Sequence, residues 1–379
     1  MEKPSLVDLA KALVNDEFFY HIHPVVSLET GTIIGGECLL RWRDETGSIH
    51  YPGEFIPLAE ESGFIVDIGR AMLPKLAAHL RELNSSFPEF FLTVNISQPE
   101  LESNRFVEDF VSAIQDAGAN LANIRVEITE RVFFPGYEKT QLAVQRLSDL
   151  GVQMLLDDFG VGYSSVEYLS QLPLVALKVA FELVNSIHEQ VYNFKVMRHL
   201  IGLGHQLGLY IIAEGIESEE GLTLLASSGC TEVQGFLFGK PLPFDEFLRQ
   251  VQEGRRIWTG YPFGLDYLAQ FDHIDLRRDL IREVLVLHTR HDEETRQRSL
   301  ARLPNIDAHS CLFGKWYYGA GRLRLTNAEN YKALGVAHED FHESCHRLLE
   351  AANQGQPLQV LIAIISELSE QSREVMSLA

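Results

Sequence analysis

One pattern recurs along the first 250 residues. A short apolar run of strand length is followed by a loop, and then by a segment whose apolar positions recur every three to four residues, as on one face of a helix. Such alternation of strands and helices predicts a β/α barrel. The first apolar run could instead pair antiparallel with the second, which would make the barrel irregular. The strand candidates are FFYHIHPVVSL, IIGGECLLRW, FFLTVNIS, IRVEITE, QMLLDDF, VALKVA, LYIIAEGI and EVQGFLF.

From about residue 272 onward the pattern is helical only. Four helical segments joined by short loops predict a four-helix bundle. The stretch before them, which contains EGRRIWTGYPFGLDY, is rich in Gly and aromatic residues and is interpreted as a linker. We therefore expect an α/β fold with a modified TIM-like (β/α)8 barrel over residues 1–250, a linker over 251–271 and an all-α bundle over 272–379.

Polar side chains stand at the ends of nearly all the strand candidates. The carboxyl ends of the strands of such a barrel meet at one rim, so these side chains should converge. A lone glutamate after a strand is usually a helix cap or a surface charge, but repetition over seven strands argues for a site. The residues are Glu37, Asn95, Glu127 with Glu130, Asp157 with Asp158, Lys178, Glu214 with Glu217, and Gln234.

Carboxylates gathered in a partly buried cleft repel one another, so the arrangement is explained best by divalent cations. Oxygen ligands favour Mg²⁺ or Mn²⁺ over zinc. Asp157 and Asp158 should point to opposite sides of an extended strand end, so each could serve a different metal. A lysine such as Lys178 could hold the attacking water, and a glutamate such as Glu214 could take its proton. The residues thus indicate a metal-dependent hydrolase or lyase, with a phosphoester substrate favoured.

The amino-acid composition limits the kinds of molecule that the protein can bind. A formal charge of −21 argues against non-specific binding to nucleic acid, so a phosphate-bearing substrate would need metal ions. No run approaches the roughly 18 consecutive apolar residues of a membrane helix, and the first residues lack the features of a signal peptide. We expect a cytoplasmic protein that binds neither DNA nor membranes. The four cysteines are too few and too scattered for a disulfide framework, so each is a free thiol or a metal ligand.

The segment from about residue 5 to 250 resembles the EAL domain, a bacterial family of cyclic di-GMP phosphodiesterases named for a Glu-Ala-Leu motif. That motif reads ECLLRW here, and it is followed in order by FIPLAEESG, VNIS, EITE, DDFGVGYSS, LKVA, AEGIES and QGFLFGKPLP. The resemblance implies hydrolysis of cyclic di-GMP to linear pGpG with two divalent metals. It also implies that the loop FGVGYSS couples dimerisation to metal and substrate binding, so a homodimer is expected.

The resemblance also implies roles for single residues. Asp158 would bind the second metal, and Glu130 would anchor the loop after it. Lys178 and Glu214 would position and deprotonate the attacking water, and Gln234 would support that network. Substrate contacts would come from Arg41, Leu40 and Gln234. The implied ligands of the first metal are Glu37, Asn95, Glu127 and Asp157.

Several positions depart from the family pattern. Where the family usually has Lys-Ile-Asp, this chain has Lys178, Val179 and Ala180, so a carboxylate beside the catalytic lysine is missing. Val175 stands where an acidic residue is usual. His23 replaces the glutamine of a Tyr-Gln-Pro turn, and Cys38 replaces the alanine of the name motif. Loss of the charge at Ala180 could lower the rate without preventing binding.

Histidine is dense in the C-terminal part, which also holds Cys311. His338 and His342 are four residues apart and so share one helix face, a common metal-chelating arrangement, although a lone His pair is more often a solvated face. CLFGKWYYG and HEDFH resemble the motifs of the CZB domain, a zinc-binding module of bacterial chemoreceptors. The resemblance implies zinc held by Cys311, His338, His342 and one histidine of the first helix, for which His288 is the best match by its spacing to Cys311 and His291, one turn further on, is the competitor.

Together these features predict a cyclic di-GMP phosphodiesterase regulated by zinc or by thiol oxidation sensed in the C-terminal domain. The alternative is a catalytically weak or inactive receptor for cyclic di-GMP and zinc that acts through protein partners. A pure scaffold is the third hypothesis.

Overall fold

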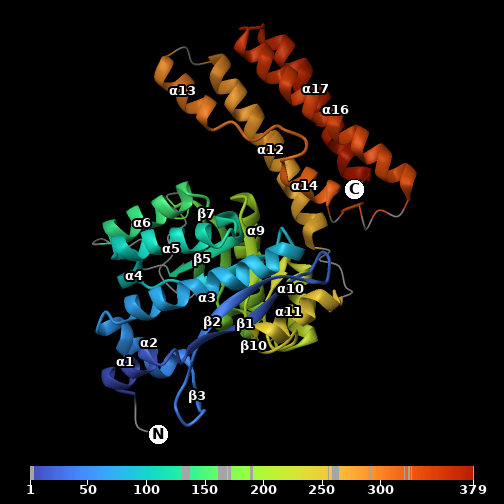
Figure 1. Ribbon diagram of the computed structural model, residues 1–379. Helices are drawn as coiled ribbons and strands as arrows, with labels where there is room; N and C mark the ends of the chain where they lie inside the picture. Colours follow the sequence, from blue (N-terminus) through green and yellow to red (C-terminus); the bar gives the residue numbers. More distant parts are fainter. Residues whose placement is uncertain are drawn as a thin grey trace. The chain divides into compact units, whose positions relative to one another are not determined.

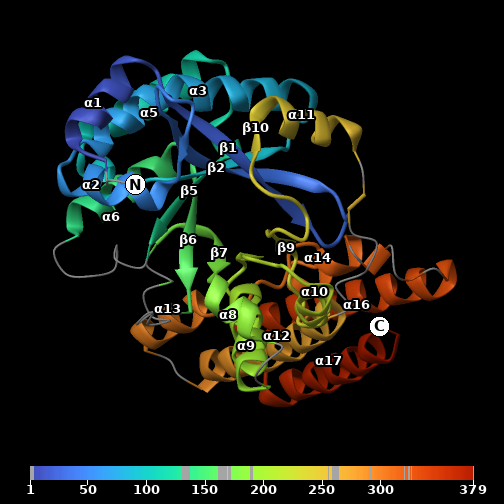
Figure 2. The same ribbon diagram turned by 90° about the horizontal axis from the view of Figure 1, so that it is seen from below.

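The computed structural model describes residues 4–129, 137–160, 169, 172–187, 191–254, 256–257, 264–289, 292–319, 321–322, 325 and 327–378. The chain forms two compact units, Met1–Pro262 and Phe263–Ala379. The first is a barrel with helices around it, and the second is helical (Figures 1 and 2). No helix within the described ranges is long and apolar enough to cross a membrane.

The strands of the first unit close into a ring. Their order is β10-β1-β9-β8-β7-β6-β5-β4-β2-β3, and an additional pairing between β1 and β2 completes the closure. β1 runs antiparallel to both β2 and β9, while the remaining ring strands are parallel, so the predicted irregular β/α barrel is confirmed. β3 and β10 extend the sheet outside the ring. The bounds are β1 Phe18–Ser27, β2 Ile33–Arg43, β3 Ile49–His50, β4 Phe91–Asn95, β5 Ile124–Thr129, β6 Gln153–Phe159, β7 Leu174–Val179, β8 Tyr210–Ala213, β9 Glu232–Val233 and β10 Leu242–Pro243.

Amphipathic helices cover the outside of the ring. In α3, buried residues such as Ile68, Met72, Leu76 and Leu80 recur every four residues and form the face turned to the core. Figure 1 shows α5 beside α3. The helices of this unit are α1 Leu6–Val14, α2 Pro52–Glu61, α3 Ile65–Ser86, α4 Gln98–Glu102, α5 Asn104–Asp116, α6 Glu138–Asp149, α8 Phe181–Ser186, α9 Val191–Gln206, α10 Glu219–Ser227 and α11 Phe244–Glu253, with a 3₁₀ turn at Leu121–Asn123.

At the amino ends of the strands, buried polar groups satisfy one another. Arg125 of β5 donates from Nη1 to Glu232 Oε2 of β9 at 2.9 Å and from Nε to Gln153 Oε1 of β6 at 3.1 Å. The guanidinium carbon lies 3.5 Å from the centroid of the Phe91 ring. Arg125 and Glu232 are both buried, so loss of either partner would leave an uncompensated charge. This end of the barrel is a closed structural layer.

The second unit is built on long helices. Figure 1 shows α16 and α17 running side by side, and α12 contacts both of them as well as α13 and α14. The all-α character predicted for this part is confirmed. The expected linker over 251–271 is helical at both ends, because α11 ends at Glu253 and α12 begins at Gly264. The bounds are α12 Gly264–Thr289, α13 Glu293–Ala301, α14 Leu312–Tyr318, α16 Ala328–Asn353 and α17 Leu358–Leu378.

Glu100 is a buried carboxyl group in α4. Its side chain accepts hydrogen bonds from Ser97 N at 2.8 Å and Ser97 Oγ at 2.5 Å, which caps the helix. A Cβ at Gly69 would lie 2.0 Å from Glu100 Oε1, so glycine allows α3 to approach this carboxyl group. Burial raises the pKa of Glu100 to about 7, against the opposing effect of the Ser97 hydrogen bonds.

This pKa predicts how stability depends on pH. The folded chain holds the proton of Glu100 up to a higher pH than the unfolded chain does, so the free energy of unfolding should fall as pH rises from 5 to about 7 and then level off. Glu100→Gln should remove this part of the slope, worth about 2 to 3 kcal/mol between pH 5 and 8. Urea unfolding at several pH values measures it. Glu82→Gln, at an exposed position of α3, is the control, and parallel stability curves for wild type and Glu100→Gln would contradict the prediction.

Candidate functional site

Lys178 of β7 is the centre of the polar groups at the carboxyl ends of the strands. Its Nζ lies 2.6 Å from Glu127 Oε2 of β5, 3.3 Å from Glu37 Oε2 of β2 and 3.7 Å from Asp157 Oδ1 of β6. It also forms an ion pair with Glu214, the residue that follows β8. Lys178 is only 2% exposed, so its ammonium group depends on these carboxylates for solvation. The structure thus brings together residues from separate strands that the sequence placed at one rim.

Two amides fix the orientation of Glu37. Asn95 Nδ2 donates to Glu37 Oε1 at 2.9 Å, and Gln234 Nε2 donates to Glu37 Oε2 at 2.8 Å. Two buried acceptors, Glu127 Oε1 and Gln234 Oε1, have no hydrogen-bond partner in the described part of the chain. Unpaired buried acceptors are costly, and a cation nearby would satisfy them. The site therefore fits a hard divalent metal.

Asp157 and Asp158 do not point to opposite sides, so the prediction drawn from an extended strand is wrong. Asp158 has φ of 55°, in the left-handed region that non-glycine residues rarely adopt. The register between β6 and β7 is also irregular from Leu156 to Phe159. As a result, carboxylate oxygens of Asp157, Asp158 and Glu214 lie within 4.8 Å of one another. This grouping has the spacing of a metal site.

Burial, and after it the crowding of charged groups, shifts the pKa values at this rim. Burial, with Glu37 adding to it, raises the pKa of Glu127 well above its usual range. Burial raises the pKa of Glu214 to about 7 although Lys178 opposes the shift. Burial alone would lower the pKa of Lys178, but the surrounding carboxylates, Glu127 first, raise it well above its usual range. When all five carboxylates are ionised, the one lysine leaves four negative charges, which two divalent cations would balance.

A pocket of about 300 Å³ opens onto these groups. Besides the charged residues, its walls carry the aromatic rings of Phe181 and Phe236. Convergent polar groups beside an apolar part of the wall are typical of a ligand site. The lining residues are His23, Glu37, Leu39, Asp157, Lys178, Phe181, Glu214, Gly215, Glu217, Gln234, Gly235 and Phe236.

Some sequence-predicted residues are placed differently or lie outside the described ranges. Leu39 lines the pocket, whereas Leu40, expected in contact with substrate, faces the other side of β2 because side chains alternate along a strand. Ala180 is buried and is the N-cap of α8, where no side chain caps the helix. Glu130 and positions 161–165 of the loop FGVGYSS are not among the described residues.

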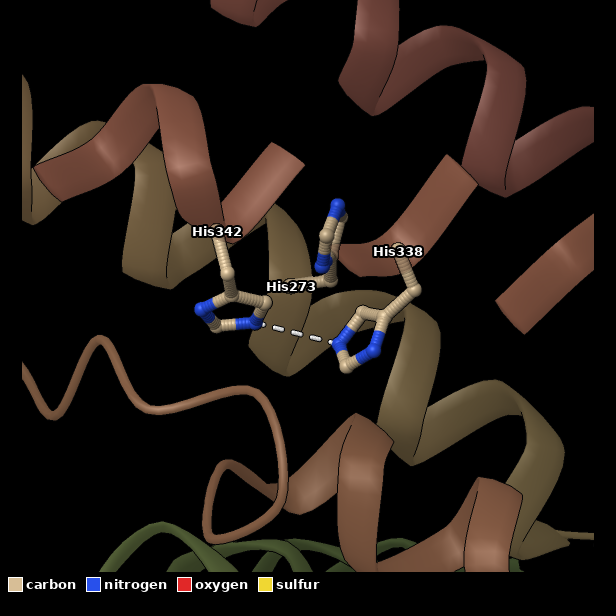
Figure 3. A group of neighbouring side chains, drawn as sticks. All are labelled: His273, His338 and His342. Carbon is tan, nitrogen blue, oxygen red and sulfur yellow. Dashed lines mark hydrogen bonds between the residues drawn. The ribbon is translucent and has the colours of Figure 1, made fainter. Parts of the chain in front are cut away.

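A second group of potential ligands lies in the helical unit. Figure 3 shows the imidazole rings of His338 and His342, both from α16, gathered with that of His273 from α12. His338 Nε2 lies 3.1 Å from His342 Nε2 and 3.4 Å from Cys311 Sγ. Ligand atoms around a tetrahedral zinc ion are roughly 3.3 Å to 3.6 Å apart. The ligand atoms of the three histidines lie within 4.8 Å of one another, so the geometry fits a metal site of three histidines, with the Cys311 sulfur in contact with one of them, His338.

The protonation and surroundings of these residues also suit a metal. Burial lowers the pKa of His273 and His338 to about 3 and lowers that of His342, so all three rings are neutral near pH 7. His342 Nδ1 donates to Ile306 O at 2.7 Å, which leaves Nε2 as the acceptor. Neither ring nitrogen of the buried His273 has a hydrogen-bond partner in the described chain. A zinc ion would supply the missing partner.

His273 replaces His288 as the first-helix histidine of this group. The two residues are 15 positions apart in α12, about 22 Å along a straight helix, so His288 cannot reach the same point. His291 is outside the described residues. The sequence held a signal for His273, which continues the buried stripe formed by Leu276, Leu280, Val284 and Leu287 at helical spacing, whereas His288 lies off it.

Comparisons with known proteins agree with the fold. The EAL domain profile matches residues 6–241, and the chemoreceptor zinc-binding domain (CZB) profile matches residues 281–349, so His273 lies before the second match. The bifunctional diguanylate cyclase/cyclic di-GMP phosphodiesterase MucR of Pseudomonas aeruginosa is 32% identical over 65% of this chain and 36% of its own length. The cyclic di-GMP phosphodiesterase PdeR of Escherichia coli is 34% identical over 64% of this chain and 36% of its own.

Comparison with solved structures also finds an EAL barrel. The phosphodiesterase part of MucR in complex with cyclic di-GMP superposes with a TM-score of 0.61 and 32% identity, over 64% of this chain and 98% of that one. This chain spans about a third of the length of the curated relatives named above. The chain belongs to the EAL domain family, and its helical unit carries a match to the chemoreceptor zinc-binding domain.

Proposed function

We propose that the barrel hydrolyses one phosphodiester bond of cyclic di-GMP and releases linear pGpG. The observation that carries this proposal is the convergence of Glu37, Glu127, Asp157 and Glu214 on Lys178. Relatives named as cyclic di-GMP phosphodiesterases support the choice of substrate, and a related barrel has been solved with cyclic di-GMP bound.

Two Mg²⁺ or Mn²⁺ ions would be held at this rim. Asp158 would serve the second ion, next to Asp157. When bound, such ions polarise a phosphoryl oxygen and lower the pKa of water. The residues that would hold the first ion are Glu37, Asn95, Glu127 and Asp157.

The chain's own groups prepare the reaction in three ways. Asn95 and Gln234 hold the two oxygens of Glu37 in a fixed direction. The Lys178 ammonium balances the nearby carboxylates and can hold the attacking water on the phosphate side. The Glu214 carboxylate, which pairs with Lys178 at the pocket wall, accepts the proton of that water.

Ala180 is the observation that favours the second candidate function, a weak or inactive receptor of cyclic di-GMP. It removes the carboxylate that the family usually places two residues after the lysine. The metal ligands and Lys178 are all present, however, and they converge, so we favour turnover at a reduced rate.

Zinc binding in the helical unit is the proposed regulatory input. His273, Cys311, His338 and His342 form the proposed ligand set. Cys311 Sγ accepts a hydrogen bond from Gly314 N at 3.1 Å, at the start of α14, which holds the sulfur in place beside His338. Oxidation of this sulfur would release zinc, so the same site would report zinc and oxidants.

Hydrolysis tests the proposed function directly. Purified full-length chain with Mg²⁺ or Mn²⁺ should convert cyclic di-GMP to pGpG, as followed by chromatography. Glu37→Gln should lower kcat about 100-fold or more, because the amide keeps the shape of the side chain and loses the charge. Glu219→Gln, at an exposed position of α10, is the matched control. Absence of product with every divalent metal would reject the phosphodiesterase and favour the receptor.

The missing carboxylate at position 180 can be restored. Ala180→Asp places an acid at the N-cap of α8, where aspartate is a preferred residue and no side chain caps the helix now. We expect kcat to rise several-fold, while the thermal midpoint falls because position 180 is buried and the new carboxylate loses its hydration. Ala180→Ser is the matched control, since serine also caps the helix but carries no charge. Equal rates for the two variants would show that the charge at this position is unimportant.

The assignment of the zinc histidine is tested by metal content. Wild type should bind one zinc ion in the helical unit, measured by elemental analysis and by competition with a chromophoric chelator. His273→Gln should lower zinc affinity about 100-fold, and His288→Gln should leave it unchanged. The reverse order of effects would return the assignment to His288.

A further inference from the structure

Arg41 carries a buried guanidinium group and belongs to the same strand, β2, as two residues that line the pocket. It lies on the same face of β2 as Glu37 and Leu39, because residues two and four apart on a strand share a face. Arg41 is 5% exposed, and its Nη1 donates to Leu40 O at 2.8 Å. Its Nε has no hydrogen-bond partner among the described residues. A buried N–H without a partner is costly unless a ligand satisfies it.

An aromatic ring, rather than a carboxylate, covers this guanidinium. Arg41 Cζ lies 5.0 Å from the centroid of the Tyr51 ring, which is a cation–π distance. No carboxylate of the described chain forms an ion pair with Arg41. A carboxylate would occupy the N–H donors and repel an anion, whereas a ring face holds the guanidinium and leaves its donors open. The arrangement therefore suits an arginine that must bind a phosphate.

Tyr51 is in turn held by a clamp centred on His50. Tyr51 N donates to Glu54 Oε1 at 3.1 Å, and Glu54 Oε2 lies 3.0 Å from His50 Nδ1. His50 Nε2 lies 2.9 Å from Asp44 Oδ2. The His50 ring also stacks on the Trp42 ring, with centroids 4.4 Å apart. Backbone and ring contacts thus fix the corner between β3 and α2 that presents Tyr51.

The clamp requires a charged imidazole. A neutral histidine can donate from only one ring nitrogen, so bonds to two carboxylates need the imidazolium form. Burial alone would lower the pKa of His50, but its bonds to Asp44 and Glu54 raise it above the usual value. These two carboxylates, one before β3 and one from α2, are the charged groups that bond to His50. Deprotonation of His50 would release one of them.

We propose that Tyr51, fixed by the His50 clamp, is a positioning residue that holds Arg41 in the orientation in which it binds a phosphate group of the dinucleotide. This inference rests on the proposed function, since it takes cyclic di-GMP as the ligand. Tyr51 acts on binding and takes no part in the chemical step, which belongs to the groups around Lys178.

The test compares two substitutions at the same position. Tyr51→Ala removes the ring and should raise KM about three- to tenfold, with kcat changed less than twofold. Tyr51→Phe keeps the ring and should restore the wild-type KM. Tyr192→Ala, at an exposed tyrosine of α9, is the control for loss of a surface ring. A matching rise in Kd, measured by calorimetry with Ca²⁺ in place of Mg²⁺, gives a readout that does not depend on turnover.

Two further measurements show whether the loss of binding in Tyr51→Ala depends on Arg41 and on His50. In an Arg41→Met background, Tyr51→Ala should change Kd no further, because its partner is gone. His50→Ala should raise Kd at pH 6, and the difference from wild type should shrink as pH rises through the raised pKa of His50, because wild type then loses the clamp as well.

Several results would overturn the proposal. Unchanged KM and Kd in Tyr51→Ala, an equal loss in Tyr51→Phe, or an additive loss in the Arg41→Met background would each show that Tyr51 does not act by holding Arg41. If wild type binds no cyclic di-GMP at all, the proposed function fails, and the positioning role fails with it. Normal binding by wild type with any of the first three results rejects the positioning role alone.

Discussion

The buried ammonium of Lys178 is the constraint on which the barrel depends. Carboxylates from separate strands can converge in a poorly solvated space only if positive charge is present among them. Lys178 supplies one such charge and is paired with Glu127 and Glu214 at close range. It does not balance the whole group, and the remaining negative charge is what would attract divalent cations. The same imbalance makes the rim a poor structural layer and a suitable place for metal ions.

The two ends of the barrel show the difference. At the amino ends, Arg125 and Glu232 pair and leave a closed layer. At the carboxyl ends, Asp158 adopts a strained backbone conformation and Glu127 keeps an unpaired oxygen. Strain and unsatisfied groups are expected where a ligand completes the structure. The helical unit also has unsatisfied groups where a ligand would bind. The buried ring nitrogens of His273 have no partner in the described chain.

Much of this could be predicted from the sequence. The alternation of strand-like and helix-like segments predicted the barrel, and the helix-only pattern after it predicted the helical unit. The polar residues at the strand ends predicted the groups around Lys178. The irregular β1–β2 pairing was foreseen as an alternative. The direction of Asp158 was not, because a bulge and a left-handed residue leave no mark in a hydrophobic pattern. Spacing to Cys311 does not predict His273, because the distance along the chain does not tell which histidine of α12 faces the other helices; its position on the buried stripe of α12 does.

The central claim is that the charge left around Lys178 is balanced by two divalent cations. Titration of the full-length chain with Mn²⁺, with zinc already bound in the helical unit and free Mn²⁺ followed by electron paramagnetic resonance, measures this directly. The account predicts two Mn²⁺ ions per chain in wild type and one in Asp158→Asn. Failure of wild type to bind Mn²⁺, or unchanged binding in Asp158→Asn, would contradict the two-metal rim.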